Sequence, residues 1–261
     1  MSFIEIRDVG KSYGDNIILE QVNNNVEAGE FITIVGTSGC GKTTFLKMLL
    51  GTEFPNHGAI LMGGKPIPQE PGEDRGIVFQ RYSVFPHLTV LQNLVLPKEL
   101  EKSLIVSRLF GTARKKAEEK ARQMLEMVGL QHAANQYPHE LSGGMQQRLA
   151  IAQALMKQPK ILLLDEPFGA LDPGIRADMH ELILKIWRDT HVNIFMITHD
   201  LKEGFYLGTR LWVFDKIRHD PQAPNAYGAT ITYDIPVGKI DTSTLNEIDQ
   251  SLEPSRKETV A

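Results

Sequence analysis

The chain has 261 residues, 42% of them hydrophobic and 23% charged, which is ordinary for a globular protein with a buried core. A formal net charge of −4 argues against a nucleic-acid-binding protein, because such proteins carry a basic excess. The single cysteine, Cys40, excludes an intrachain disulfide and favours a reducing compartment. No stretch is long and apolar enough to cross a bilayer, so any work at a membrane requires another chain.

The first eighty residues predict short strands around one helix. The run FITIV is continuously apolar and β-branched, which is typical of a strand buried on both faces. A glycine-rich segment follows it, and FLKMLLG at 45–51 then predicts a helix that ends at Gly51. Strands are expected at 2–9, 17–26, 31–35, 58–62 and 75–79.

The remainder of the chain alternates helices with buried strands. Asp172 followed by Pro173 predicts a helix start. Helices are expected at 113–129 and 143–157 and from 173, strands at 161–165, 193–197 and 229–237, and a frayed end at 251–261. This order predicts a parallel α/β core in a single domain, 1–261. Its core would comprise 1–89 and 159–261, with a helical subdomain inserted at 90–158.

The segment GTSGCGKTT fits G-x-x-x-x-G-K-[ST], a pattern in which glycine-flanked backbone N–H groups wrap nucleotide phosphates. Lys42 is expected to reach the β- and γ-phosphates, and the Thr43 hydroxyl to ligate Mg²⁺. A glycine turn with a chance lysine is the alternative, which the flanking strand and helix disfavour. The predicted phosphate-binding residues are Gly36, Thr37, Ser38, Gly39, Cys40, Gly41, Lys42, Thr43 and Thr44.

Polar residues follow three of the predicted strands, where ligands collect at the carboxyl ends of parallel sheets. Asp165 ends ILLLD and is expected in the Mg²⁺ shell, with Glu166 as the base that deprotonates the attacking water. His199 is expected to contact the γ-phosphate and position that water. Gln80 is a further candidate ligand of Mg²⁺ or water. Taken alone, Glu166 is better explained as a surface acid and His199 as a structural histidine; the neighbouring Asp165 and the place of His199 after a buried strand favour the functional interpretations.

These motifs occur in an order that resembles the ATP-binding-cassette (ABC) ATPases, over residues 1–215. The resemblance is carried by GTSGCGKTT, the glutamine in VFQ, LSGGM, ILLLDEP, the ALD at 170–172 and the histidine in THD. It implies a P-loop NTPase core with an N-terminal antiparallel β part and an inserted helical subdomain. It also implies that Asp172 is the D-loop residue and that Tyr13 stacks on adenine. A half-exposed strand tyrosine is the alternative for Tyr13.

The resemblance gives a role to the second glycine pair, in LSGGM. In this family two copies pack head to tail, so Ser142, Gly143 and Gly144 would bind the γ-phosphate held by the partner. Met145 stands where the commonest signature has glutamine, and methionine lacks the amide donors of that residue. A plain helix N-cap is the alternative; it explains Ser142 but not two successive glycines.

The resemblance further implies an importer subunit that uses ATP and Mg²⁺ on the inner face of the membrane. Its partners would be a second ATPase subunit, transmembrane permease subunits and, indirectly, a periplasmic or extracellular solute-binding protein, with no nucleic acid. GEDRGIVFQ and LSGGMQQR resemble the nitrate, sulfonate and taurine group, whereas FPHLTV is closer to polyamine and iron importers. Tyr82, Val84, Phe85 and Leu88 are candidates for the permease contact or for internal packing.

Two rival functions differ in class. A stand-alone ABC ATPase that acts on nucleic acid or as a regulator would respond to nucleic acid, and the acidic balance disfavours it. A small-molecule kinase with a P-loop needs neither LSGGM nor an acid beside Asp165. The segment 215–228 receives no role.

Overall fold

The computed structural model describes residues 2–79, 84–102, 111–218, 220, 222–223 and 225–237, and for 100–102 the backbone alone. The chain divides into two compact units, one from residues up to 72 together with those from 191 onward (unit 1), the other from 73–190 (unit 2). Gln80, Tyr82 and the expected frayed end lie outside the described residues. The expected limits of the helical subdomain, 90–158, stay a prediction.

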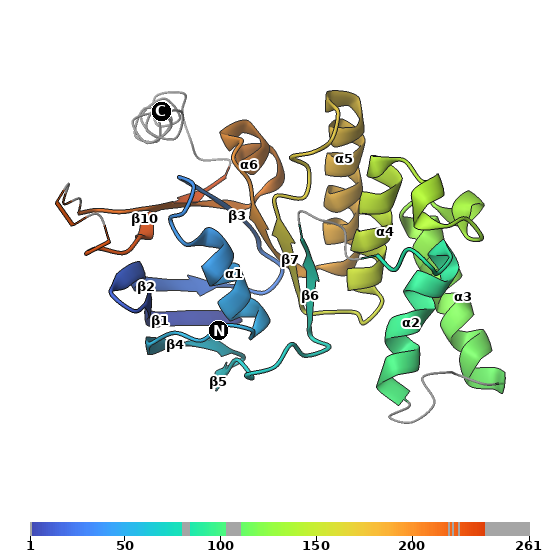
Figure 1. Ribbon diagram of the computed structural model, residues 1–261, viewed down its shortest axis with the longest axis horizontal. Helices are drawn as coiled ribbons and strands as arrows, with labels where there is room; N and C mark the ends of the chain where they lie inside the picture. The colour runs from blue at the N-terminus through green and yellow to red at the C-terminus, as the bar shows by residue number, and fades with distance from the viewer. Residues whose placement is uncertain are drawn as a thin grey trace. The chain divides into compact units, whose positions relative to one another are not determined.

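Unit 1 contains an antiparallel sheet formed by the N-terminal part of the chain (Figure 1). Its strands lie in the order β2 (Asn16–Val26), β1 (Ile4–Tyr13), β4 (His57–Met62) and β5 (Lys65–Pro66). Ile4 and Ile6 are buried, while Arg7 is exposed, as the alternation predicts. The strands expected at 2–9 and 17–26 are therefore confirmed, and they extend into a hairpin around Gly14.

The other sheet of unit 1 has parallel strands at its centre. β3 (Phe31–Gly36) pairs in parallel with both β8 (Asn193–Ile197) and β9 (Arg210–Asp215), and β10 (Thr230–Pro236) is antiparallel to β9. All five residues of β8 are buried, as expected for a strand covered on both faces. The helix α1 (Lys42–Leu50) packs against β3 and β8, and α6 (Leu201–Leu207) against β3 and β9. Neither β9 nor α6 was expected.

Unit 2 combines two parallel strands, β6 (Arg75–Val78) and β7 (Ile161–Asp165), with a group of helices. The helices are α2 (Val90–Lys102), α3 (Gly111–Met127), α4 (Gly143–Leu155) and α5 (Pro173–Thr190), with 3₁₀ turns η1 (Gln131–Ala133) and η2 (Pro138–Glu140). Figure 1 shows α2, α3 and α4 gathered together, and the three contact one another. The helices expected at 113–129, at 143–157 and from 173 are confirmed. α2 was expected only as part of a helical block.

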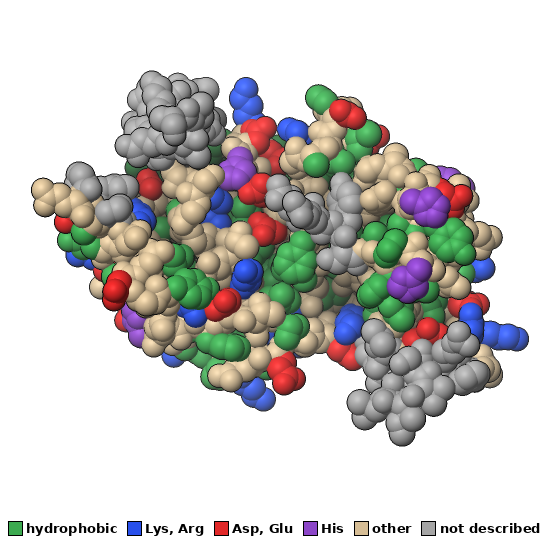
Figure 2. All heavy atoms as spheres, in the orientation of Figure 1, with side chains coloured by type: hydrophobic (Ala, Val, Ile, Leu, Met, Phe, Trp, Pro, Cys, Tyr) green, Lys and Arg blue, Asp and Glu red, His purple; other side chains and the backbone are tan. Residues whose placement is uncertain are grey.

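The predicted fold class is confirmed, with an N-terminal antiparallel part, mostly parallel strands elsewhere and a group of helices. On the face drawn in Figure 2, acidic and basic side chains are interspersed. No helix in the described part of the chain is long and apolar enough to span a membrane.

A charged network fixes the last described strand of unit 1. Arg210 on β9 pairs with both Asp234 on β10 and Glu30. Asp234 also accepts hydrogen bonds from Asn24 Nδ2 and Trp212 Nε1, each at 3.0 Å. Burial alone would raise the pKa of Asp234, but the hydrogen bonds from Arg210 and Asn24 and the guanidinium charge hold it below its usual range.

We expect Asp234→Ala to lower the free energy of unfolding by about 1–2 kcal/mol at neutral pH, because three donors lose their acceptor. The folded-state pKa is depressed, so the ionised group stabilises the fold above its unfolded pKa of about 3.9. That contribution is lost as the pH falls further, through the folded pKa. Urea unfolding measured from neutral pH downward should therefore show that the difference in the free energy of unfolding between wild type and Asp234→Ala becomes smaller below about pH 4.

Glu118→Ala is the matched control, because it removes an exposed i,i+4 ion pair with Arg114 on α3. Exposed pairs contribute little, so its stability should stay close to wild type at every pH. An Asp234→Ala protein as stable as this control would show that the network does not stabilise the fold.

Candidate functional site

The glycine-rich segment of unit 1 leads directly into α1. The helix begins at Lys42, three residues before the predicted start at 45, so that prediction is wrong at its boundary. Lys42, Thr43 and Thr44 therefore form the first helical turn rather than the end of a loop. Gly41 precedes the helix with φ 93°, and no side chain caps it. With glycine as the N-cap, this helix start has no capping side chain from that position and suits an anion.

Lys42 folds back over the segment that precedes it. Its ammonium is buried and donates hydrogen bonds to the carbonyl oxygens of Gly36 and Thr37, at 2.8 Å each. Thr43 is exposed at the start of the helix, and Ser38 and Gly39 are exposed in the loop. The predicted phosphate loop is therefore a real loop, with its lysine held inside the loop by backbone oxygens.

Gly36 ends β3 where the backbone of β9 passes very close. A methyl group added at Gly36 would lie 2.2 Å from the carbonyl oxygen of Phe214, and its φ is 152°. No side chain fits there unless the backbone moves. The first glycine of the motif is therefore required by the sheet as well as by the loop.

Aromatic packing holds α1 in place. Phe45 in its second turn is fully buried, with its ring centroid 5.3 Å from that of Phe214 and 6.2 Å from that of Trp212. Phe195 on β8 lies on Trp212 at 5.9 Å, in an edge-to-face arrangement. Burying one such ring stabilises the fold by about 2–3 kcal/mol. Because Phe45 is three residues from Lys42, this packing also fixes the start of the helix.

Cys40 lies inside the loop and is buried. Burial raises the pKa of its thiol, against the opposing effect of the nearby Lys42 ammonium. The thiol is thus protonated at neutral pH and is not the form that acts as a nucleophile.

His199 is exposed in the turn between β8 and α6. Asp200, next to it, is the N-cap of α6, and its carboxylate accepts hydrogen bonds from the N–H groups of Lys202 and Glu203. The Thr198 hydroxyl donates to the Glu203 carboxylate and accepts from the Asp200 N–H. The histidine backbone is therefore held from both sides.

Tyr13 ends β1 with 47% of its surface exposed. The Thr44 side chain, in the first turn of α1, is near enough to the phenol to act on the pKa of Tyr13, against the larger raising effect of burial. The structure therefore brings the predicted adenine-stacking residue to the helix of the phosphate loop.

In unit 2, Asp165 and Glu166 are half-buried at the end of β7, after four fully buried residues. Glu166 has φ 48°, in the left-handed region that a glutamate rarely adopts. Such a conformation costs about 1 kcal/mol, and backbone strain tends to cluster at functional sites, although Asp8, Gln21, Gln158 and His191 also have positive φ. Asp172 is exposed immediately before α5.

The LSGGM segment forms the start of α4. Ser142 is its N-cap, and the hydroxyl accepts a hydrogen bond from Met145 N–H at 3.3 Å. Gly144 is buried, and a methyl group there would lie 2.5 Å from Ile175 Cγ2 on α5. The identities of Ser142 and Gly144 are therefore each explained by local structure. Gly143 is exposed and has no such explanation here.

The sequence analysis missed Asn93, which is fully buried on α2. Its amide accepts from Phe85 N–H at 2.8 Å and donates to the carbonyls of Phe85, Leu88 and Thr89. One side chain thus orders a segment that has no hydrophobic period. The only available signal was a polar residue among apolar neighbours in LTVLQNLVL.

Comparison with known proteins agrees with these motifs. Residues 19–169 match the ABC transporter family. The chain therefore belongs to this family, whose ATP-binding subunits are ATPases coupled to transport. It is 41% identical over 214 residues to the nitrate import ATP-binding protein NrtD of Synechocystis sp., covering 80% of this chain and 77% of that protein. It is 43% identical over 202 residues to the aliphatic sulfonates import ATP-binding protein SsuB of Bacillus licheniformis, covering 77% and 74%.

A solved structure, the dimeric post-hydrolysis state of the ATP-binding cassette MJ0796 bound to ADP and Pi, matches with a TM-score of 0.71. The match is 28% identical and covers 91% of this chain and 100% of that one. The predicted resemblance to ABC importers is confirmed.

We expect Gly36→Ala to destabilise the protein by about 2 kcal/mol, because the added methyl group meets backbone rather than a movable side chain. Gly39→Ala is the matched control: Gly39 has φ 79°, but nothing lies within 4 Å of an added methyl group. It should cost only about 1 kcal/mol, from backbone strain. Equal midpoints of urea unfolding for the two variants would contradict the close approach of Gly36 to β9.

Proposed function

We propose that this chain is the ATPase subunit of an importer for a small anion such as nitrate or a sulfonate. The observation that carries the proposal is the buried Lys42 ammonium at the start of α1, inside a glycine-bounded loop, in a chain of the ABC transporter family. The similarity of this chain to a nitrate import and to an aliphatic sulfonates import ATP-binding protein supports this choice of solute class.

In this proposal each candidate residue has a role in binding or hydrolysing ATP. The loop from Gly36 to Thr44 binds the phosphates, and Tyr13 stacks on the adenine. Glu166 deprotonates the attacking water, while His199 and Gln80 position it. The role of Glu166 as the base is supported by its strained backbone and by its place directly after the buried strand β7.

In this proposal the Mg²⁺ ion is bound chiefly by phosphate oxygens of the nucleotide. The Thr43 hydroxyl and Asp165 carboxylate, with Gln80, supply the oxygen ligands that Mg²⁺ prefers. In the described part of the chain, no three or more histidine, cysteine or acidic side chains are arranged so that they could hold a metal ion by themselves. A magnesium held by one or two protein oxygens and by phosphates needs no such group. When bound, it neutralises charge that develops on the phosphates.

Two copies of the chain are proposed to pack head to tail around two ATP molecules. Ser142, Gly143 and Gly144 then contact the partner's γ-phosphate, and Asp172 lies at the interface. The dimeric ADP- and Pi-bound relative supports this arrangement. The cap hydrogen bond of Ser142 is compatible with it, because a hydroxyl has two acceptor lone pairs and a donor.

The subunit is proposed to work on the inner face of the membrane, on permease subunits that receive solute from a binding protein. Phe85 is 39% exposed, and Val84 and Leu88 are half-buried beside it. Because Asn93 fixes this short segment from within, it offers a rigid apolar contact for a permease.

Glu166→Gln tests both the base and the dimer. We expect turnover to fall by at least about 100-fold, because the amide cannot take the proton, while ATP binding is retained. In solution, light scattering should show its mass doubling with MgATP, and adding Ser142→Arg should abolish the doubling. Glu181→Gln, exposed on α5, is the control for a charge-removing change and should hydrolyse ATP as wild type does.

Near-normal phosphate release by Glu166→Gln would remove Glu166 as the base. A monomeric mass at saturating MgATP, both alone and with permease-containing membranes, would contradict the head-to-tail dimer.

A further inference from the structure

Two charged side chains hold the ring of Tyr13. Lys11 Nζ lies 4.8 Å from the ring centroid, in cation–π contact. The Glu53 carboxylate, after burial, helps to raise the pKa of the Tyr13 hydroxyl beside it. Glu53 Oε2 in turn lies 2.9 Å from Lys11 Nζ. Tyr13, Lys11 and Glu53 therefore form a closed set of contacts, here called the Tyr13 clamp.

The clamp is fixed to the end of α1. Gly51 and Thr52 donate backbone hydrogen bonds to Lys47 O at 3.0 Å, and Glu53 N–H donates to the same oxygen at 3.3 Å. Lys11 Nζ also donates to the carbonyl of Phe54 at 2.9 Å. The helix that begins with Lys42 thus ends in residues that hold Tyr13.

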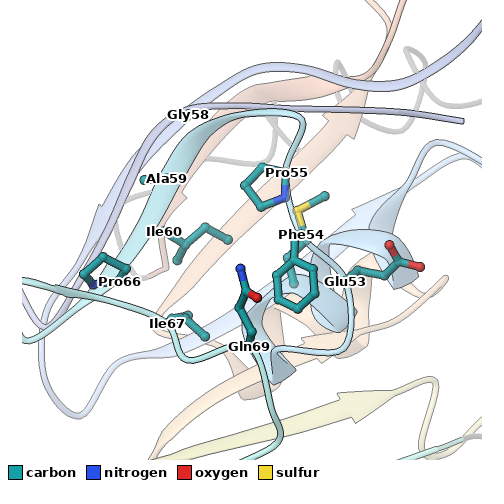
Figure 3. Close-up of a pocket in the computed structure, with 10 residues that line it drawn as sticks. Glu53, Phe54, Pro55, Gly58, Ala59, Ile60, Pro66, Ile67 and Gln69 are labelled. Atoms are coloured by element: carbon teal, nitrogen blue, oxygen red, sulfur yellow. The ribbon is translucent and has the colours of Figure 1, made fainter.

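The Glu53 carboxylate makes its contacts within the clamp, although Glu53 also lines a neighbouring pocket. That pocket, about 220 Å³ in volume, is lined mainly by apolar side chains, among them Phe54, Ile60 and Ile67. Figure 3 shows Glu53 at its rim, with the carboxylate directed away from Ile60 and Ile67. The hydrogen bond from Lys11, above all, lowers the pKa of Glu53, so the carboxylate stays ionised as an acceptor at neutral pH.

The clamp restricts the ring in a way that suits stacking. Lys11 occupies one face, so a base has to stack on the other. Because Glu53 holds Lys11 against the ring, fewer χ1 rotamers are open to the phenol. A side chain that is already ordered loses less conformational entropy when a ligand binds, which favours affinity.

We propose that Glu53, together with Lys11, is a positioning residue for the nucleotide base and acts by fixing the plane of Tyr13. The inference rests on the proposed function, in which Tyr13 stacks on adenine. Neither Glu53 nor Lys11 touches the nucleotide in this proposal.

The test compares MgATP with tripolyphosphate, a competitive inhibitor that has no base. We expect Tyr13→Ala to raise the KM for ATP by about 5- to 30-fold, as one stacked ring is worth about 1–2 kcal/mol. Glu53→Ala should raise it by about three- to fivefold, and kcat should change little. The inhibition constant of tripolyphosphate should not change in either variant, because the phosphate loop is intact.

Two further variants separate positioning from general damage. Glu53→Gln keeps an acceptor for Lys11 and should recover most of the affinity. Glu53→Ala in a Tyr13→Ala background should add no further change in KM. Glu5→Ala is the matched control, because it removes an ion pair with Arg7 on the same strand. Its KM should equal that of wild type.

Each outcome decides a different claim. An unchanged KM in Tyr13→Ala would overturn the stacking itself, and the positioning role with it. A raised KM in Tyr13→Ala but not in Glu53→Ala would overturn the positioning role and leave stacking intact. If Glu53→Ala weakens the binding of tripolyphosphate as much as that of ATP, the substitution acts through α1 and the phosphate loop. That result would also overturn the positioning role.

Discussion

The packing of Phe45 on Trp212 and Phe214 is the contact on which the candidate site depends. It joins the start of α1 to β9, the strand whose backbone also touches Gly36. Trp212 donates to Asp234, which pairs with Arg210, so the same strand is tied to β10 and to Glu30. A rigid aromatic layer therefore supports the phosphate loop from outside, in addition to the hydrogen bonds that Lys42 makes within it.

The parts of the fold that follow from local pattern were predictable from sequence. The FITIV and ILLLD strands, the helix ended by Gly51 and the helix start at Pro173 all have short-range signals. β9 and α6 were missed because RLWVFD carries charges at both ends and α6 is only seven residues long. The Tyr13 clamp was missed because it joins residues forty positions apart, and no periodicity encodes such a contact.

The second glycine pair shows why a motif alone does not separate structure from function. Ser142 caps α4, and Gly144 makes room for Ile175, so both residues would be favoured even in a chain that does not form a dimer. Gly143 has no comparable packing role among the contacts described above. Glu166 is the reverse case, because its left-handed backbone is a local cost that no packing argument predicted.

The buried thiol of Cys40 provides a chemical probe of opening of the phosphate loop. It is the only cysteine in the chain, it is 3% exposed, and its raised pKa keeps the reactive thiolate scarce. Modification by a small thiol reagent therefore requires the loop to open, and the labelling rate measures the free energy of that opening. If the loop binds nucleotide as proposed, a bound nucleotide opposes that opening, so its occupancy can be followed as protection of one sulfur atom, without a fluorophore or an engineered cysteine.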